Sequence, residues 1–174
     1  MINEELRKEL KGYIEENYID LSPKQYFIKY GVFEDALLRP ESVKESRHVS
    51  CSISMPELPE LDESFSEMLL RKIDEKGMKD SECYNKALVD RRLFSKIRSD
   101  KFYSPSKKTA IALALALELE EDEFNDLLHK AGFSLSGSNL FDVIVKFFIE
   151  KQIYDIATID EYLLDNDQET IGKY

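Results

Sequence analysis

The sequence predicts an all-α fold, a bundle of short helices. Helix-forming residues such as Leu, Glu, Lys and Ala are abundant, whereas six Gly and five Pro in 174 residues are too few for a loop-rich β architecture. Apolar residues recur every three or four positions behind residues that typically cap helix N-termini. Because 43% of the residues are hydrophobic, including 10 Phe and 9 Tyr, the chain can bury a sizeable core.

Changes in this pattern divide the chain into four segments. The linker between the first and the second helical part loses the helical period, and Pro56 and Pro59 interrupt regular structure there. Its acidic end, ELPELDES, is either solvated or docked on a basic surface of the same molecule. The expected segments are an N-terminal helical segment (residues 1–39), the linker (40–63), a central helical domain (64–133) and a C-terminal helical extension (134–174).

Two helices are expected in the N-terminal segment. The first spans residues 3–18, with Asn3 as its cap and one apolar stripe opposite its Glu and Lys residues. The second has Ser22 as its cap and Pro23 in its first position, and it ends at Gly31. The apolar stripe of the first helix consists of Leu6, Leu10, Tyr13 and Ile14.

The central domain begins with three short helices. Ser64 and Glu67 form a capping box for the first, which Gly77 ends. The second is SECYNKA, and after the turn LVD the third begins at Arg91 with Asp90 as its cap. The face of the third helix that we expect to be buried consists of Leu93, Phe94 and Ile97.

The stretch AIALALALELE alternates with a period of two, yet it is predicted to be a helix. Its residues are strong helix formers, and we place an N-terminal cap at Ser104 with Pro105 in the first helical position. On a helix Leu113 and Leu115 lie on nearly opposite sides. The element is therefore predicted to be buried all round, at the centre of the bundle.

Three more helices complete the prediction. One has acids in its first turn from Glu120 and ends at Gly132. A Ser/Gly linker over residues 134–138 precedes a very apolar helix capped by Asn139, and a last helix spans residues 158–164. The aromatic residues of the apolar helix either pack back on the bundle or form an interface with a partner or a second copy.

A basic patch lies in the central domain of an acidic chain. Between residues 88 and 110, seven Lys or Arg outnumber two Asp, a net +5 in a chain whose net charge is −11, so the remainder carries −16. This negative field opposes non-specific attraction to nucleic acid or anionic membranes. The candidate binding residues are Arg91, Arg92, Ser95, Lys96, Arg98, Lys101, Lys107 and Lys108.

Read without gaps, SECYNKA, LVD and RRLFSKIRS resemble the helix-turn-helix of lambda-repressor-like (XRE-type) domains. They correspond to the first helix, the turn and the recognition helix of that family, and TAIALALALEL falls where the family has an apolar helix. The resemblance covers roughly residues 64–131 and implies a helix-turn-helix core for the central domain. By position, it implies major-groove contacts for Arg91, Arg92, Ser95 and Lys96, and phosphate contacts for Lys101, Lys107 and Lys108.

Some residues differ from those that the family usually has at the same positions. Asp80 places a carboxylate where the family often contacts a phosphate, and this charge would repel DNA. The differing residues are Asp80, Tyr84, Leu88, Arg98 and Asp100.

A second resemblance concerns the context of the protein. The run from LDESFSEMLLRKIDEKGM through LFSKIRS to AGFSLS is similar to an accessory domain of bacterial defence or signalling proteins, where it follows another domain such as a macrodomain. This resemblance implies an assembly in which the protein works, and it implies no activity.

No catalytic residue, metal site or cofactor is expected. The sequence has no Gly-rich phosphate loop, HExxH or GxSxG motif, and two Cys with two His are too few for a disulfide framework or a Cys/His metal site. The polar run over residues 165–167 lacks the spaced ligands of a calcium loop and is expected to be a turn. Because the N-terminus lacks the apolar core of a signal peptide and no apolar stretch approaches 18 residues, we expect a cytoplasmic protein with no membrane partner.

Two functions are compatible with these observations. The first is a non-enzymatic adaptor or regulator that uses the helix-turn-helix-like bundle to bind a protein partner in a bacterial defence or signalling assembly. The second is a sequence-specific DNA-binding transcriptional regulator that works as a homodimer. The departures from the family and the net charge of −11 favour the adaptor.

Overall fold

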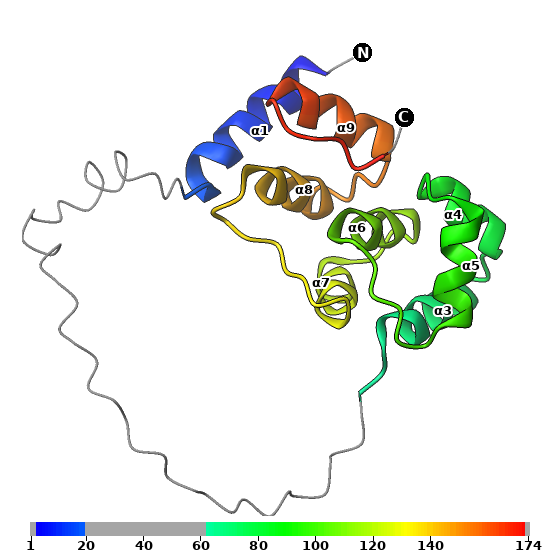
Figure 1. Ribbon diagram of the computed structural model, residues 1–174. Helices are drawn as coiled ribbons and strands as arrows, with labels where there is room; N and C mark the ends of the chain where they lie inside the picture. The colour runs from blue at the N-terminus through cyan, green and yellow to red at the C-terminus, as the bar shows by residue number, and fades with distance from the viewer. Residues whose placement is uncertain (1–2, 20–61, 173–174) are drawn as a thin grey trace, which may run out of the picture. The chain divides into compact units, whose positions relative to one another are not determined.

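The computed structural model describes residues 3–19 and 62–172 (Figure 1). Within these ranges all regular structure is α-helical, which confirms the predicted all-α fold. The predicted helix over residues 22–31 and the linker as far as residue 61 lie outside the described residues. The described helices are α1 (Glu4–Asn17), α3 (Phe65–Glu75), α4 (Asp80–Lys86), α5 (Arg91–Ser99), α6 (Lys107–Ala116), α7 (Glu121–Lys130), α8 (Leu140–Glu150) and α9 (Ile156–Asp165).

Helix α6 forms the centre of the bundle. It contacts α4, α7 and α9, and Figure 1 shows it between the α3–α5 group and α8. Every residue from Ala110 to Leu117 is buried. The helix is therefore buried all round, as the sequence predicts, and its neighbours surround it with apolar faces of their own.

The start of α6 differs from the prediction. Ser106, and not Ser104, is the N-cap, because its side-chain oxygen accepts a hydrogen bond from the Thr109 backbone N–H at 3.3 Å. Its hydroxyl also lies 2.8 Å from the hydroxyl oxygen of Thr109. Pro105 is buried just before the cap instead of occupying the first helical position. Two serines flank this proline, and the one that reaches the free amides of the first turn sets the helix start.

Helices α3, α4 and α5 form a group beside α6. In the capping box of α3, the Ser64 hydroxyl accepts from the Glu67 backbone N–H at 3.3 Å, and the Glu67 carboxylate accepts from the Ser64 backbone N–H at 3.0 Å. After α3 the chain turns at Gly77, whose φ of +62° favours glycine. Because α3 contacts α5 and α7 while α4 contacts α5 and α6, packing stabilises these short helices.

Helix α1 packs against α8 and is bonded to α9. The Tyr162 hydroxyl accepts from the Asn3 backbone N–H at 3.1 Å and donates to the Asn3 carbonyl oxygen at 3.0 Å. The Tyr13 hydroxyl donates to the Glu150 carboxylate at 2.7 Å. Helix α1 thus belongs to the same compact unit as α3–α9.

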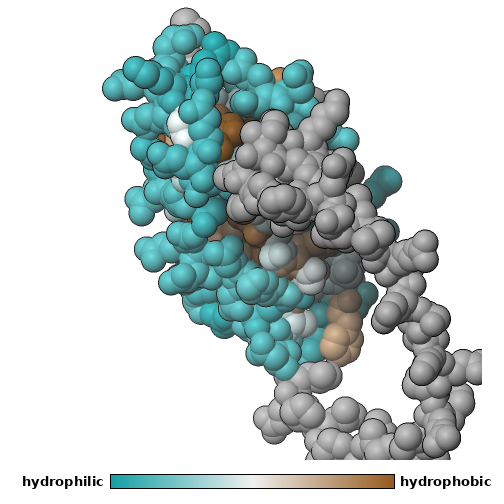
Figure 2. All heavy atoms as spheres, turned by 90° about the vertical axis from the view of Figure 1, so that its left-hand side faces the viewer, coloured by the Kyte–Doolittle hydropathy of each residue, from teal (hydrophilic) through white to brown (hydrophobic). Residues whose placement is uncertain are grey.

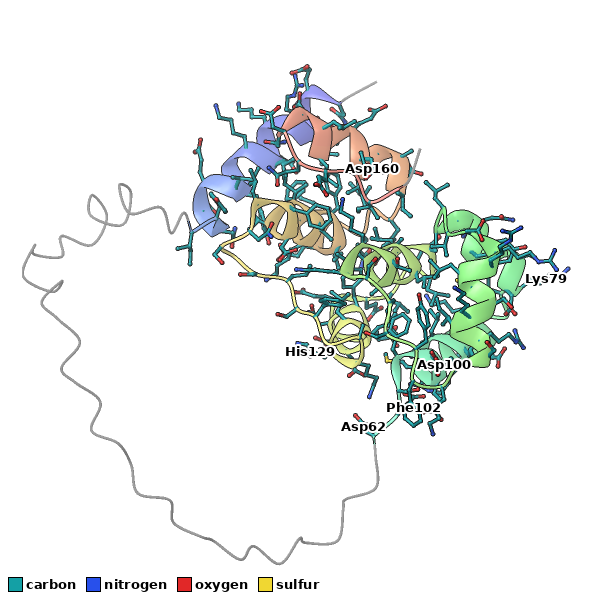
Figure 3. All side chains as sticks on the ribbon, in the orientation of Figure 1. Asp62, Lys79, Asp100, Phe102, His129 and Asp160 are labelled. Atoms are coloured by element: carbon teal, nitrogen blue, oxygen red, sulfur yellow. The ribbon has the colours of Figure 1, made fainter. Side chains whose placement is uncertain are left out.

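A buried carboxylate holds the segment after α9. Asp160, labelled in Figure 3, accepts hydrogen bonds from the backbone N–H groups of Ile171 at 2.6 Å and Gly172 at 3.0 Å. The Lys108 ammonium group donates to the carbonyl oxygen of Thr170 at 2.8 Å. The two bonds to Asp160 offset the cost of burying its carboxylate. Together with the bond from Lys108, they fix residues 169–172 near the start of α6.

Hydrophilic residues cover most of the described surface on the face shown in Figure 2. Large apolar side chains are nevertheless exposed at a few positions of the described ranges. Two of them, Leu88 and Leu164, line the same groove. The exposed large apolar residues are Ile19, Leu88, Phe102 and Leu164.

Candidate partner-binding site

The turn between α4 and α5 fixes the direction of the predicted recognition helix. Leu88 adopts a φ of +53°, and the Val89 backbone N–H donates to the Tyr84 carbonyl oxygen at 2.9 Å. Asp90 then caps α5 by accepting a hydrogen bond from the Arg92 backbone N–H at 2.7 Å, as the sequence predicts. The chain therefore leaves α4 and enters α5 within a short, hydrogen-bonded turn.

One face of α5 is anchored in the core. Phe94 and Ile97 are buried, Leu93 is half-buried, and the Phe94 ring centroid lies 5.6 Å from that of Tyr84. The opposite face is open to solvent. We call four of its exposed residues, Arg91, Arg92, Ser95 and Lys96, the α5 outer face.

The cations of the α5 outer face differ from the other cations of the basic patch. Arg91, Arg92 and Lys96 form no ion pair with any residue in the described ranges. The remaining four cations are each paired with an acid of the same chain, which weakens their attraction for an external anion. These pairs are Arg98 with Asp80, Lys101 with Glu67 at 2.7 Å, Lys107 with Asp142 at 2.6 Å and Lys108 with Glu169 at 2.8 Å.

Glu67 is held in its ionised form by its surroundings. The hydrogen bond from Lys101 and the one from the Ser64 backbone N–H lower the pKa of Glu67 to about 2. The carboxylate is thus charged at neutral pH, and Lys101 has an anion beside it. This pairing leaves Lys101 less suited to the phosphate contact that the family resemblance implies.

Acidification is expected to reduce the contribution of Glu67 to stability between pH 4.5 and about 2. Its pKa in the folded chain lies below the ordinary value of 4.5, so its contribution is present above pH 4.5 and is lost as the pH falls through the folded value. Unfolding free energies measured by urea titration at several pH values should therefore fall less steeply for Glu67→Gln than for the unmodified chain. Equal slopes for both proteins would contradict this role of Glu67.

Two open grooves border α5. The first, which we call the basic groove, lies between α4 and α5, and Figure 3 shows Lys79 on the side of these helices that faces away from α6. The second, the apolar groove, has a volume of about 760 Å³ and adjoins the α4–α5 turn. The basic groove is lined by three cations and two acids together with polar and apolar residues, namely Lys79, Arg91, Arg98, Asp74, Asp80, Met78, Ser81, Tyr84, Phe94 and Ser95. The apolar lining residues of the apolar groove are Ala87, Leu88, Val89, Leu93, Ala112, Leu164 and Ile171, and Asp90, Lys108 and Glu169 are its charged lining residues.

The apolar groove is the part of the site that the sequence reasoning missed. It brings the α4–α5 turn together with α9 and with residues 169–172, which are more than 70 positions away in the chain. The only available signal was Leu88, which stands where the lambda-repressor-like family usually has Gly. Phe102, a further exposed aromatic residue after α5, carried no recognisable pattern (Figure 3).

Cys83 and the acidic residues of the described ranges form neither a reactive thiol nor a metal-binding cluster. Burial raises the pKa of the Cys83 thiol to about 12, so a thiolate nucleophile is not formed at neutral pH. Within residues 3–19 and 62–172, no cluster of three or more His, Cys, Asp or Glu has the arrangement of a metal site. None of the helices in these ranges combines the length and the apolar character needed to cross a bilayer.

The basic patch therefore separates into three unpaired cations on α5 and four paired cations, of which Arg98 also belongs to α5. Comparison with other proteins adds no assignment at this point. No family model, curated protein or solved structure shows a significant match to this chain.

Proposed function

We propose that this protein is a non-enzymatic adaptor or regulator that binds an acidic protein partner through the α5 outer face. The observation that carries the proposal is the set of three unpaired cations, Arg91, Arg92 and Lys96, on one face of a helix whose other face is buried. The resemblance to accessory domains of bacterial defence or signalling proteins supports an assembly of that kind as its setting.

The distribution of ion pairs favours a protein partner over DNA. Duplex DNA is bound by neutralising many phosphates, and each neutralised phosphate releases condensed counterions. Here the three lysines implied as phosphate contacts, Lys101, Lys107 and Lys108, are already paired with acids of the chain. The whole chain, with its net charge of −11, repels a polyanion, whereas a short acidic segment needs only the local charges of α5.

Sequence-specific DNA binding remains the second candidate, and one observation favours it. Asp80, the carboxylate that by sequence would repel a phosphate, is ion-paired with Arg98, so its charge is largely compensated. In that reading Arg91, Arg92 and Ser95, near the N-terminus of α5, would contact base edges in the major groove.

Binding of a labelled oligoglutamate peptide and of random-sequence duplex DNA, measured at several salt concentrations, tests the choice. We expect the peptide to bind and the Arg92→Ala/Lys96→Ala variant to weaken it by about tenfold or more, since each unpaired charge contributes about 1 kcal/mol. Lys8→Ala/Lys11→Ala is the matched control, because it removes the same charge from exposed positions of α1. Duplex DNA is expected to bind poorly even at low salt.

The opposite pattern would assign DNA as the ligand. If duplex DNA binds more tightly than the peptide, the logarithm of its affinity should fall with the logarithm of salt by about 0.9 for each phosphate contacted. Loss of this binding in the α5 variant, but not in the α1 control, would replace the adaptor with the DNA-binding regulator. Equal effects of the two variants would contradict both candidates.

A further inference from the structure

The apolar groove combines exposed apolar side chains with a concave surface. Leu88 is 45% exposed and Leu164 is 61% exposed, although both are large apolar residues. They lie in the wall of one groove of about 760 Å³, together with half-buried Leu93 and buried Ile171. This volume is within the range of pockets that hold side chains or small ligands, and apolar surface gathered in one hollow is typical of interaction sites.

Leu88 is retained in the groove despite an unfavourable backbone conformation. Its φ of +53° lies in the left-handed region, which costs a residue with a Cβ about 1 kcal/mol or more. The chain uses Gly at two comparable helix ends, Gly77 and Gly132. Among the described non-glycine residues with positive φ, Leu88 is the apolar one, and the others are Glu118, Gln152 and Asp167. A strained, exposed leucine at this position indicates a role that glycine could not fill.

The charges beside the groove favour an acidic occupant. Leu93 lines the groove, and Lys96 lies three residues further along α5, so the two side chains are neighbours on the helix surface. Of the two acids that line the groove, Glu169 pairs with Lys108, whereas Asp90 caps α5 and keeps its charge. Arg92 and Lys96, beside the groove on α5, pair with no acid in the described ranges, and these two cations outnumber the one unpaired acid, Asp90.

We infer that the partner presents an acidic amphipathic helix whose apolar side chains enter the apolar groove and whose carboxylates meet Arg92 and Lys96. This inference rests on the proposed function and specifies the partner that the α5 outer face recognises. An amphipathic helix places apolar residues at i, i+3 or i+4 and i+7 on one side, which suits the apolar side chains of the groove, and carboxylates on its flank suit the adjacent cations. Leu88 and Leu164 supply the apolar contact, and the two cations set its orientation.

Three synthetic peptides of about 15 residues test this inference by fluorescence anisotropy. The first is built from Glu, Ala and Leu, with Leu on one helical face. The second has Ser in place of each Leu, and the third has the composition of the first in an order that scatters Leu around the helix. We expect the first peptide to bind the full chain about tenfold or more tightly than the other two, because only it buries apolar surface in register.

Variants of the groove provide the second arm of the experiment. Leu88→Gly should remove the apolar contact without loss of stability, because glycine relieves the left-handed strain, and Leu164→Ser alters an exposed side chain. Both substitutions should lower the affinity for the first, amphipathic peptide and leave the affinity for the second, serine-containing peptide unchanged. In methyl NMR spectra, the signals of Leu88 and Leu164 should shift on addition of the first peptide, while those of Leu6 in α1 should stay in place.

Each contrary outcome identifies what is wrong. If all three peptides bind equally and bind the Arg92→Ala/Lys96→Ala variant more weakly, the proposed acidic partner is supported. The inference that its apolar side chains enter the apolar groove is then overturned. If none binds, the proposed function fails together with this inference. If the chain forms a dimer by sedimentation velocity and Leu88→Gly abolishes it, the occupant of the groove is a second copy and the inference is overturned.

Discussion

Leu115→Ala is expected to lower the free energy of unfolding by about 2 to 5 kcal/mol. Leu115 has no exposed surface and lies in α6, the helix that contacts α4, α7 and α9. Removing its side chain leaves a cavity at a place where the surrounding helices are fixed by contacts on several sides. The structure can relax only partly into that space, so the substitution loses both apolar burial and packing contacts.

Urea unfolding followed by far-UV circular dichroism measures this effect. Leu164→Ala is the matched control, because it makes the same chemical change at a side chain that is 61% exposed. The control should change the free energy of unfolding by about 0.5 kcal/mol or less. A loss of that small size for Leu115→Ala would contradict the central position of α6.

Lys107→Ala is expected to destabilise the fold by about 2 to 4 kcal/mol. Its partner Asp142 is 1% exposed, and one of the two carboxylate oxygens of Asp142 has no hydrogen-bond partner in the described structure. Lys107 and the Ser136 backbone N–H, which donates to Asp142 at 3.0 Å, are the groups that compensate the buried charge. Removing one partner of a buried pair leaves the other charge uncompensated, and partial exposure of Lys107 keeps the loss below that of a fully buried pair.

A companion substitution separates this effect from a general disturbance. Asp142→Asn removes the charge that Lys107 compensates, so the double variant should recover at least half of the stability lost in Lys107→Ala. Lys101→Ala, which breaks an ion pair at the surface, should cost less than about 1 kcal/mol. Thermal unfolding of the unmodified chain, Lys107→Ala, the double variant and Lys101→Ala provides the comparison. Equal losses for Lys101→Ala and Lys107→Ala would contradict the structural role of Lys107.

Lys107 is accordingly a poor probe of nucleic-acid binding. By sequence it stands among the phosphate contacts of a helix-turn-helix protein, but its substitution changes the link between α6 and α8. Arg92 and Lys96 are better probes, because they are exposed and no described residue pairs with them.

Local chemistry explains the parts of the fold that the sequence predicts correctly. The capping box at Ser64, the cap at Asp90 and the all-round burial of α6 can each be predicted from residues close together in the chain. In α6 the propensity of Ala and Leu for helices outweighs the misleading period of two. The cap of α6 was misplaced because Ser104 and Ser106 both flank Pro105, and only the three-dimensional path of the chain decides between them.

The candidate site is less predictable because its character depends on distant residues. Counting charges finds the basic patch, but it does not show that Lys107 meets Asp142 or that Lys108 meets Glu169, 61 positions later. In the same way, the apolar groove needs Leu88 and Leu164 to be brought together by the packing of α4 and α9 around α6. Periodicity indicates which face of each helix is buried and says little about which helices meet.

The bonds between α1 and the C-terminal helices have a consequence for synthesis. On a ribosome, α1 emerges long before α8 and α9, since Asn3 and Tyr162 are separated by 159 positions. The apolar stripe of α1, which packs against α8, therefore has no partner from this part of the fold until α8 has been synthesised. Its docking depends on contacts of long sequence separation, which form late in folding.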